Sequence, residues 1–417
     1  MKIKRLEINY FRGISDLTLN FNQREPNIII GINGVGKSSI LDALSLLLSR
    51  FMEWIGGVVP IEELRKFNEL DIANNSSLTK LQLTISSNGG EDSWELLRSR
   101  SGVSEDAMHE MARASANAMW RHWYNEPQYN IPLAVYYPVN RAVADINLEI
   151  PTQNNLKQID AYREALIDGK VNFTSFFQWF RNREDLESEL LRDQLDYRDQ
   201  QLEAVRQAVT SLLPNFSNLR VRRSPLRMTL IKDGEELIIN QLSDGEKCLL
   251  AMVGDLARRL AIANPGLSEP LQGNGVVLID EIELHLHPKW QREIIPALTR
   301  TFPNCQFIVT THSPQVISQI KPEGIYLLEK TTQGIVAKRP ESSFGRDSNR
   351  ILEDLMGVPE RPQIIKDKIL ELFRLIDASN LEGARQLRQQ LVEEIGADEP
   401  EFVRADVLIR RKEILNR

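Results

Sequence analysis

The sequence predicts an α/β fold in which helices alternate with the strands of a mostly parallel sheet. Short, fully apolar segments of strand length recur along the chain, and most are followed by a helical pattern. One of these strands runs without a break through a glycine-rich loop into an apolar helix. A chain of 417 residues, with 42% hydrophobic and 26% charged residues, is long enough to build more than one lobe around such a sheet.

The first 54 residues are expected to form three strands and a helix. KIKRLEINYF at residues 2–11 alternates apolar and polar side chains, and LTLNF at 17–21 is its expected hairpin mate. PNIII at 26–30 is apolar and β-branched, which is typical of a buried strand. The helix expected at 40–54 is strongly apolar and therefore belongs in the core.

The middle of the chain has a less regular pattern. The expected elements are strands at 78–86 and within 131–143, a turn at 88–92, and helices at 104–125 and from 157 to 213. The last stretch includes residues 183–213, which could form one helix of roughly 30 residues and roughly 45 Å.

The second half returns to alternating strands and helices and ends in helices. Strands are expected within 218–240, at 273–281 and at 305–313, and helices after 245, at 289–302, 363–379 and 380–396. These patterns divide the chain into a first lobe at 1–150, a helical insertion at 151–215, a second lobe at 216–345 and a helical C-terminal extension at 346–417.

Bulk composition limits the function classes. No run of eighteen apolar residues is present, so no membrane span is expected. The two cysteines lie in apolar runs without metal-ligand spacing, which fits buried thiols in a reducing cytoplasm. A net charge of −7 argues against a basic coat for nucleic acid, although it does not exclude a local basic patch.

The loop GINGVGKSS at residues 31–39 matches the phosphate-binding pattern G-x-x-x-x-G-K-[ST]. Its glycines allow backbone N–H groups to surround phosphate oxygens, Lys37 would reach the β- and γ-phosphates, and Ser38 would offer a hydroxyl to Mg²⁺. The position between a buried strand and a helix argues against a simple glycine-rich turn. The expected nucleotide contacts are Asn33, Gly34, Val35, Gly36, Lys37, Ser38 and Ser39.

Two acids end the strand VVLIDE, and a histidine ends the next strand. Asp280 would hold Mg²⁺, and Glu281 would orient or deprotonate the attacking water. Acids that only cap the next helix are the alternative, which the P-loop disfavours. His312 is either a capped loop residue or a sensor of the γ-phosphate.

The segment LSDGE at residues 242–246 is a polar turn that opens an apolar helix. The order of P-loop, this turn, acidic strand and histidine strand resembles the motif order of the ABC ATPases, and the turn resembles their signature motif. DEIELHLHPKWQ at 280–291 and INYFRGI at 8–14 are similar to the SMC/RecF-like soluble branch. SFGRDSNRILEDLMGVPERP at 343–362 is similar to anti-phage ATPases of the PtuA type, from Septu and retron-linked systems.

This resemblance implies a two-lobed ABC ATPase head that binds ATP and Mg²⁺. It implies that Ser243, Gly245 and Glu246 meet nucleotide held by a second copy, in a head-to-tail homodimer or a higher oligomer. Arg12 would lie near the nucleotide. The contact made by the Q-loop in that superfamily stays open between Gln82 and Arg141.

Three other features have open interpretations. His285 and His287 could ligate zinc, but no further ligand supports this, and a contact across the dimer is favoured. RVRRSPLRMTLIK at 220–232 carries five cations and no acid, and it is either a DNA-binding ribbon or a solvated strand face. The final helices either cover a domain edge or bind a partner.

The expected function is therefore an ATPase that dimerises around ATP and gates an effector nuclease in anti-phage defence. No nuclease-type acidic or histidine cluster follows residue 345, so the effector is expected to be a separate polypeptide. DNA or RNA is a further candidate partner. The alternative is a RecF/SMC-like clamp that grips DNA during repair. A transporter subunit is disfavoured, because the Ser-Ala-Leu-Asp loop usual in those subunits is missing.

Overall fold

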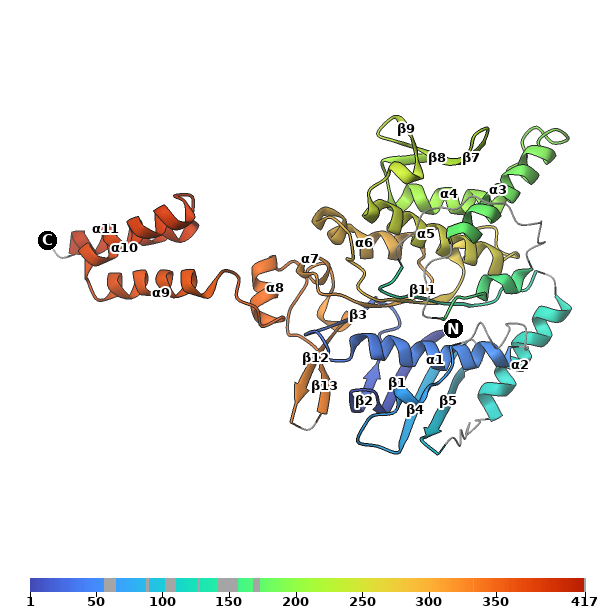
Figure 1. Cartoon of the computed structure of the whole chain (residues 1–417), viewed down its shortest axis with the longest axis horizontal. Helices are drawn as coiled ribbons and strands as arrows, with labels where there is room; N and C mark the ends of the chain where they lie inside the picture. Colours follow the sequence, from blue (N-terminus) through green and yellow to red (C-terminus); the bar gives the residue numbers. More distant parts are fainter. Residues whose placement is uncertain are drawn as a thin grey trace. The chain divides into compact units, whose positions relative to one another are not determined.

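The computed structural model describes residues 1–55, 65–87, 90–101, 110–126, 128–141, 157–167, 173–332 and 334–415. The chain packs as two compact units, Met1–Arg346 and Asp347–Arg417 (Figure 1). The four-part division expected from the sequence is finer than this and stays a prediction.

A six-stranded sheet forms the centre of the first unit. Its order is β13-β12-β3-β11-β10-β6, and every neighbouring pair is parallel except the edge pair of β12 and β13. The strands are β3 (Asn27–Gly31), β6 (Leu133–Tyr137), β10 (Gly275–Ile279), β11 (Cys305–Thr310), β12 (Ile325–Thr331) and β13 (Gly334–Lys338). Strands β6, β10 and β11 are buried throughout, which confirms the α/β fold predicted from the apolar runs.

A second, antiparallel sheet has the order β2-β1-β4-β5, and helix α1 lies between it and the central sheet (Figure 1). The elements are β1 (Lys2–Phe11), β2 (Ile14–Asn20), α1 (Lys37–Trp54), β4 (Leu78–Ser87), β5 (Gly90–Ser99) and α2 (Glu110–Asn125). Contact with both sheets explains why α1 is apolar on nearly every side. The hairpin predicted for β1 and β2 is confirmed. Residues 88–89 of the predicted turn and 104–109 of the predicted helix lie outside the described residues.

Helix α5 contacts β6 of the central sheet and packs against α3 and α4 (Figure 1). The remaining elements of this unit are α3 (Phe173–Leu190), α4 (Gln200–Leu212), β7 (Phe216–Arg223), β8 (Leu226–Lys232), β9 (Glu235–Ile238), α5 (Asp244–Ala263), α6 (Pro288–Thr301) and α7 (Pro314–Ile317). Short 3₁₀ turns occur at Glu69–Asp71, Gln158–Tyr162, Ile239–Gln241, Pro270–Gln272 and Pro322–Gly324.

The single helix that the sequence suggested for residues 183–213 is wrong. Helix α3 ends at Leu190, and α4 starts only after Asp199, whose carboxylate accepts hydrogen bonds from Gln201 N and Leu202 N at 3.0 Å each. Asp199 is also held by its own amide, which donates to Glu187 Oε1 at 2.9 Å. The N-cap therefore outweighs the helical pattern across the break.

The second unit, Asp347–Arg417, is helical. Its helices are α8 (Ser348–Asp354), α9 (Gln363–Asp377), α10 (Leu381–Ile395) and α11 (Pro400–Leu415). The last three share a core made of Ile369, Leu372, Ile376, Ala384, Leu391, Phe402, Ala405 and Ile409. The hairpin predicted over 363–396 is confirmed, and α11 completes a bundle. Within the described residues, no helix combines the length and the apolar character that a membrane span requires.

Candidate nucleotide site

The P-loop follows β3 and leads directly into α1. Gly31, Gly34 and Gly36 have φ angles of 150°, 77° and 104°, which side-chain-bearing residues rarely adopt. At Gly31 a Cβ would also come within 2.7 Å of the Leu328 carbonyl oxygen on the adjacent strand β12. The glycines predicted from the motif therefore serve a backbone shape, and the buried Val35 anchors the loop.

Lys37, the first residue of α1, is buried at the base of this loop. Its Nζ donates to the carbonyl oxygens of Gly31 at 2.9 Å and Ile32 at 3.0 Å. Burial lowers the pKa of Lys37, while the charges of Asp280, Glu281 and Glu283 act in the opposite direction. Those three carboxylates thus share one electrostatic environment with the loop lysine, and two of them, Asp280 and Glu281, are site residues named from the sequence.

Asp280 and Glu281 follow β10, next to the end of β11. Asp280 is 3% exposed, and its Oδ1 accepts a hydrogen bond from the Thr310 hydroxyl. Thr310 Oγ1 also accepts from Glu281 N at 2.7 Å. Glu281 has a left-handed backbone, with φ at 47°, so the neighbouring strand holds this residue in a sparsely populated conformation.

His312 follows β11, close to a third acid that the motifs did not single out. The carboxylate of Glu283 accepts from the Thr311 hydroxyl at 2.7 Å and from the His312 backbone N–H. Glu283 therefore fixes the backbone that presents His312. The only sequence signal for it was its place in the acidic run after β10.

Arg141 follows β6 and contacts the residues at the end of β10. Its guanidinium donates to Asp280 O, to Glu281 O at 2.5 Å and to Pro138 O at 3.2 Å, and it is 2% exposed. The sequence named Arg141 as one candidate for the Q-loop contact. The other candidate, Gln82, lies on β4 and donates to Ser93 Oγ at 3.3 Å.

The signature turn forms the N-terminus of the 20-residue helix α5. Ser243 is the N-cap, and Glu246 Oε2 accepts from both its backbone N–H at 3.0 Å and its hydroxyl at 2.9 Å. Burial raises the pKa of Glu246, but hydrogen bonds from Lys232 and Ser243 outweigh it, so the net pKa is lowered. Ser243 and Asp244 remain exposed.

Gly245 allows the signature turn to pack against the segment that follows β10. A Cβ at this position would lie 2.2 Å from the His285 carbonyl oxygen, so no larger residue fits without a shift. His285 is itself left-handed, with φ at 61°. In the described part of the chain, no hydrogen bond or ion pair joins residues 242–246 to the P-loop.

A buried charge cluster fixes α5 against the central sheet. Asp255 accepts from Arg258 Nη2 and Arg259 Nε, both at 2.6 Å, and from the Tyr137 hydroxyl at 3.1 Å. Burial raises the pKa of Asp255, but the two arginines outweigh it and lower the pKa to about 2. The helix that carries the signature turn is thereby tied to β6, the neighbour of β10.

Arg12, which the resemblance places near the nucleotide, lies in the turn between β1 and β2, and its side chain is occupied. It forms ion pairs with Asp42 of α1 and, through Nε at 2.9 Å, with Asp71. Asp42 also binds Arg65 at 2.8 Å. Any contact between Arg12 and nucleotide would therefore be made beside these carboxylates.

The other candidate groups have mostly structural partners. His287 accepts from Lys289 N at 3.3 Å and caps α6, and no metal-ligand cluster occurs among the described residues. In the basic ribbon, Arg222 pairs with Glu236 at 2.8 Å, and Arg223 pairs with Glu184, also at 2.8 Å. These pairs neutralise much of the surface that a DNA clamp would use.

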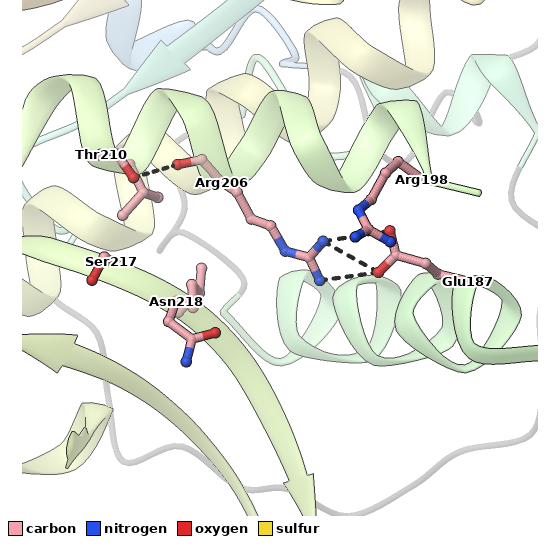
Figure 2. Close-up of a pocket in the computed structure, with 8 residues that line it drawn as sticks. Glu187, Arg198, Arg206, Thr210, Ser217 and Asn218 are labelled. Carbon is pink, nitrogen blue, oxygen red and sulfur yellow. Dashed lines mark hydrogen bonds and ion pairs between the residues drawn. The ribbon is translucent and has the colours of Figure 1, made fainter. Parts of the chain in front are cut away.

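A polar pocket of about 320 Å³ lies away from these motifs, between α3, α4 and β7 (Figure 2). Arg206 spans it and binds Glu187 at 3.2 Å and Glu203 at 2.5 Å. These ion pairs neutralise the Arg206 guanidinium that lines the pocket. The pocket is therefore explained as a packing gap between two helices and a strand.

A glycine-rich phosphate loop, its lysine and an acidic strand end on a mostly parallel sheet together define a P-loop nucleoside triphosphatase. A family model described as "AAA domain, putative AbiEii toxin, Type IV TA system" matches residues 27–318, more than half of the chain, which therefore belongs to this family.

Known relatives narrow the assignment. The "Retron Ec83 probable ATPase" of Escherichia coli is 31% identical, over 99% of this chain and 87% of that protein. The "Septu protein PtuA" of Bacillus thuringiensis is 24% identical, over 91% and 90%. A solved SmcHead bound to the C-winged helix domain of ScpA is 15% identical, covers 82% of this chain and 98% of its own, and has a TM-score of 0.49. The chain is thus an ATPase homologous to the retron and Septu proteins.

Proposed function

We propose that two copies of this chain bind two molecules of MgATP at a shared, head-to-tail interface and hydrolyse them there. The observation that carries this proposal is the signature turn. It begins a long, firmly anchored helix, leaves Ser243 and Asp244 exposed, and makes no bond to its own P-loop in the described residues. A helix N-terminus with free N–H groups suits a phosphate, and a second chain can supply that phosphate.

The residues of the site divide the chemistry among them. The backbone N–H groups of 33–39 and Lys37 bind the phosphates, with Arg12 at the edge of the loop. Ser38 and Asp280 offer hard oxygen ligands, which suit Mg²⁺. Glu281 orients and deprotonates water for attack on the γ-phosphorus, and His312 donates to the γ-phosphate. In the partner copy, Ser243, Gly245 and Glu246 complete the site.

The shared site is tested by mixing two inactive variants. Lys37→Ala has a defective P-loop but an intact signature turn. Ser243→Asp has an intact P-loop but a defective signature turn. Aspartate keeps the N-cap of α5 but repels the incoming phosphate. Each variant alone should hydrolyse almost no ATP. Random pairing of the two should restore up to about a quarter of the wild-type rate, because half of the dimers gain one intact site.

Ser243→Thr is the matched control, because it keeps both the cap and the hydroxyl and should stay active. Equal activity of Ser243→Asp and wild type, or a mixture as inactive as its components, would show that the turn does not serve a second copy. Light scattering with and without ATP reports the dimer independently of turnover.

We infer further that the ATPase gates a separate effector polypeptide in anti-phage defence, as the similarity to PtuA-type proteins implies. Helix α11 offers a docking face for it. Val403, Val407 and Ile414 are 68%, 61% and 74% exposed and lie on the side of α11 away from its core face. Arg410 and Arg411 lie on that same side and have no acidic partner among the described residues.

The charges of α11 favour an acidic partner over a second copy. Its acids face the bundle, where Asp406 binds Arg388 at 2.6 Å and Glu413 binds Arg385. Two such faces placed together would bring four arginines into contact without a carboxylate, which is repulsive. An effector with an apolar patch bordered by Asp or Glu fits instead.

Val407→Asp should weaken binding of the separate effector polypeptide by at least about tenfold, with ATP hydrolysis unchanged. Ile364→Asp, an equally drastic change at an exposed residue of α9, is the control and should bind normally. Titration calorimetry measures both. Undiminished binding by Val407→Asp rejects this face. A lowered melting temperature of the isolated variant would instead show that the chain itself covers it.

A further inference from the structure

Arg141 is a buried cation whose bonds within the described residues go to backbone oxygens or to the Cys248 thiol. It is 2% exposed, and among the described residues it forms no ion pair with a carboxylate. A guanidinium removed from water without an opposing charge costs several kcal/mol unless its hydrogen bonds are made. The carbonyl oxygens of Pro138, Asp280 and Glu281 provide those bonds.

The bonds converge on the two residues that the proposed chemistry needs most. The N–H of Asp280 donates to Tyr137 O at 2.9 Å, and the N–H of Glu281 donates to Thr310 Oγ1 at 2.7 Å. Neighbouring strands therefore hold the N–H groups of this strand end, and Arg141 joins the two carbonyls, of which Glu281 O also accepts from Leu284 N at 3.0 Å. Glu281 needs such support, because its left-handed backbone costs on the order of 1–3 kcal/mol.

We propose that Arg141 is a positioning residue of the ATPase, which clamps the carbonyls of Asp280 and Glu281 and so aims the Glu281 carboxylate at the attacking water. This inference rests on the proposed role of Glu281. In this role Arg141 acts through the backbone of Asp280 and Glu281 and not on the reacting atoms. Its planar fork reaches two carbonyls at once, which the single ammonium of a lysine does less well.

The first test separates turnover from binding. Arg141→Met should lower kcat by about tenfold to a hundredfold, because small displacements of a catalytic group have effects of that size. The affinity for ATP, measured by calorimetry, should stay within about twofold of wild type, since the P-loop is untouched. Arg141→Lys should recover part of the lost turnover. Arg206→Lys alters a half-buried arginine in the pocket away from the nucleotide site and is the control for folding.

The second test asks whether Arg141 acts through Glu281. Single-turnover hydrolysis of radiolabelled ATP is compared for Arg141→Lys, Glu281→Gln and the double variant. If Arg141 serves only to aim Glu281, the double variant should be no slower than Glu281→Gln, because residues that act as a unit are not additive. A purely structural arginine would slow both backgrounds by the same factor.

The outcomes separate this inference from the proposed function. Normal turnover of Arg141→Lys and Arg141→Met, or a full additional loss in the double variant, overturns the positioning role alone. Normal turnover of Glu281→Gln overturns the proposed base, and the positioning role falls with it. If Arg141→Met does not fold, Arg141→Lys and the double variant still decide the question.

Discussion

Lys37→Ala is expected to abolish ATP binding at working concentrations and, with it, hydrolysis. The lysine ammonium lies at the base of the P-loop, where it is held by the Gly31 and Ile32 carbonyls at 2.9 and 3.0 Å. Phosphate oxygens would replace those carbonyls as acceptors. Charge-assisted bonds of this kind contribute about 3 kcal/mol, so affinity should fall on the order of a hundredfold.

The surroundings of Lys37 add a pH dependence to this result. Burial lowers the pKa of its ammonium more than the nearby carboxylates raise it. The charge is therefore lost at a lower pH than for a free lysine, and affinity for ATP should fall as pH rises through that lowered pKa. In Lys37→Ala this alkaline decline should disappear.

Calorimetric titration with a slowly hydrolysed ATP analogue measures both effects. Lys321→Ala removes an exposed lysine that pairs with Glu25 at 3.0 Å, and it should bind like wild type over the whole pH range. Normal affinity in Lys37→Ala would refute the P-loop assignment, whatever the fate of the dimer.

Features that depend on a few consecutive residues were predictable from the sequence. The P-loop is one example, because its glycines, lysine and serine all lie in one short segment that runs from the end of β3 into the first turn of α1. The acidic pair after β10 and the cap that Ser243 gives to α5 are others. In each case the local pattern fixes the local backbone, so the sequence alone carries the information.

Features that depend on strand register were not predictable in the same way. Thr310 reaches Asp280 because β10 and β11 pair in parallel, with Ile279 opposite Val309. Arg141 reaches the same strand end because β6 is the other neighbour of β10, with Tyr137 opposite Ile279. The pattern of apolar and polar residues does not tell which strands become neighbours. The motif therefore predicted Asp280 and Glu281 but not Thr310 and Arg141, which hold them.

Charge patterns read without structure overstated the available cations. The ribbon at 220–232 contains no acid in sequence, yet Arg222 and Arg223 find carboxylates from β9 and α3. Long-range pairing of this kind also explains the broken helix at 191–199, where Glu187 and Asp199 bind across the break. Carboxylates distant in sequence therefore determine both the available charge of the ribbon and the place where the helix breaks.

Glu281→Gln is expected to bind ATP normally but to hydrolyse it about 10²–10⁴ times more slowly. Glutamine keeps the shape and one carbonyl acceptor of glutamate, but it cannot take the proton of the attacking water. The left-handed backbone at this position, supported by Thr310 and Arg141, should hold the amide where the carboxylate was. Binding steps therefore proceed and the chemical step stops.

In the proposed cycle hydrolysis reopens the shared interface, so a chain that binds ATP without hydrolysing it should accumulate in the closed, dimeric state. Light scattering should then report about twice the mass of the chain on adding MgATP, and the mass should return to that of one chain when ATP is removed.

Glu329→Gln, which changes an exposed acid bound to Lys338, is the control and should neither lose turnover nor accumulate as a dimer. Adding Ser243→Asp to Glu281→Gln should prevent the dimer, because the trapped state requires the signature turn of the second copy. If Glu281→Gln turns over ATP at the wild-type rate, another group is the base. If it is inactive yet stays monomeric, bound ATP does not hold two copies together, and the proposed ATP-trapped dimer is rejected.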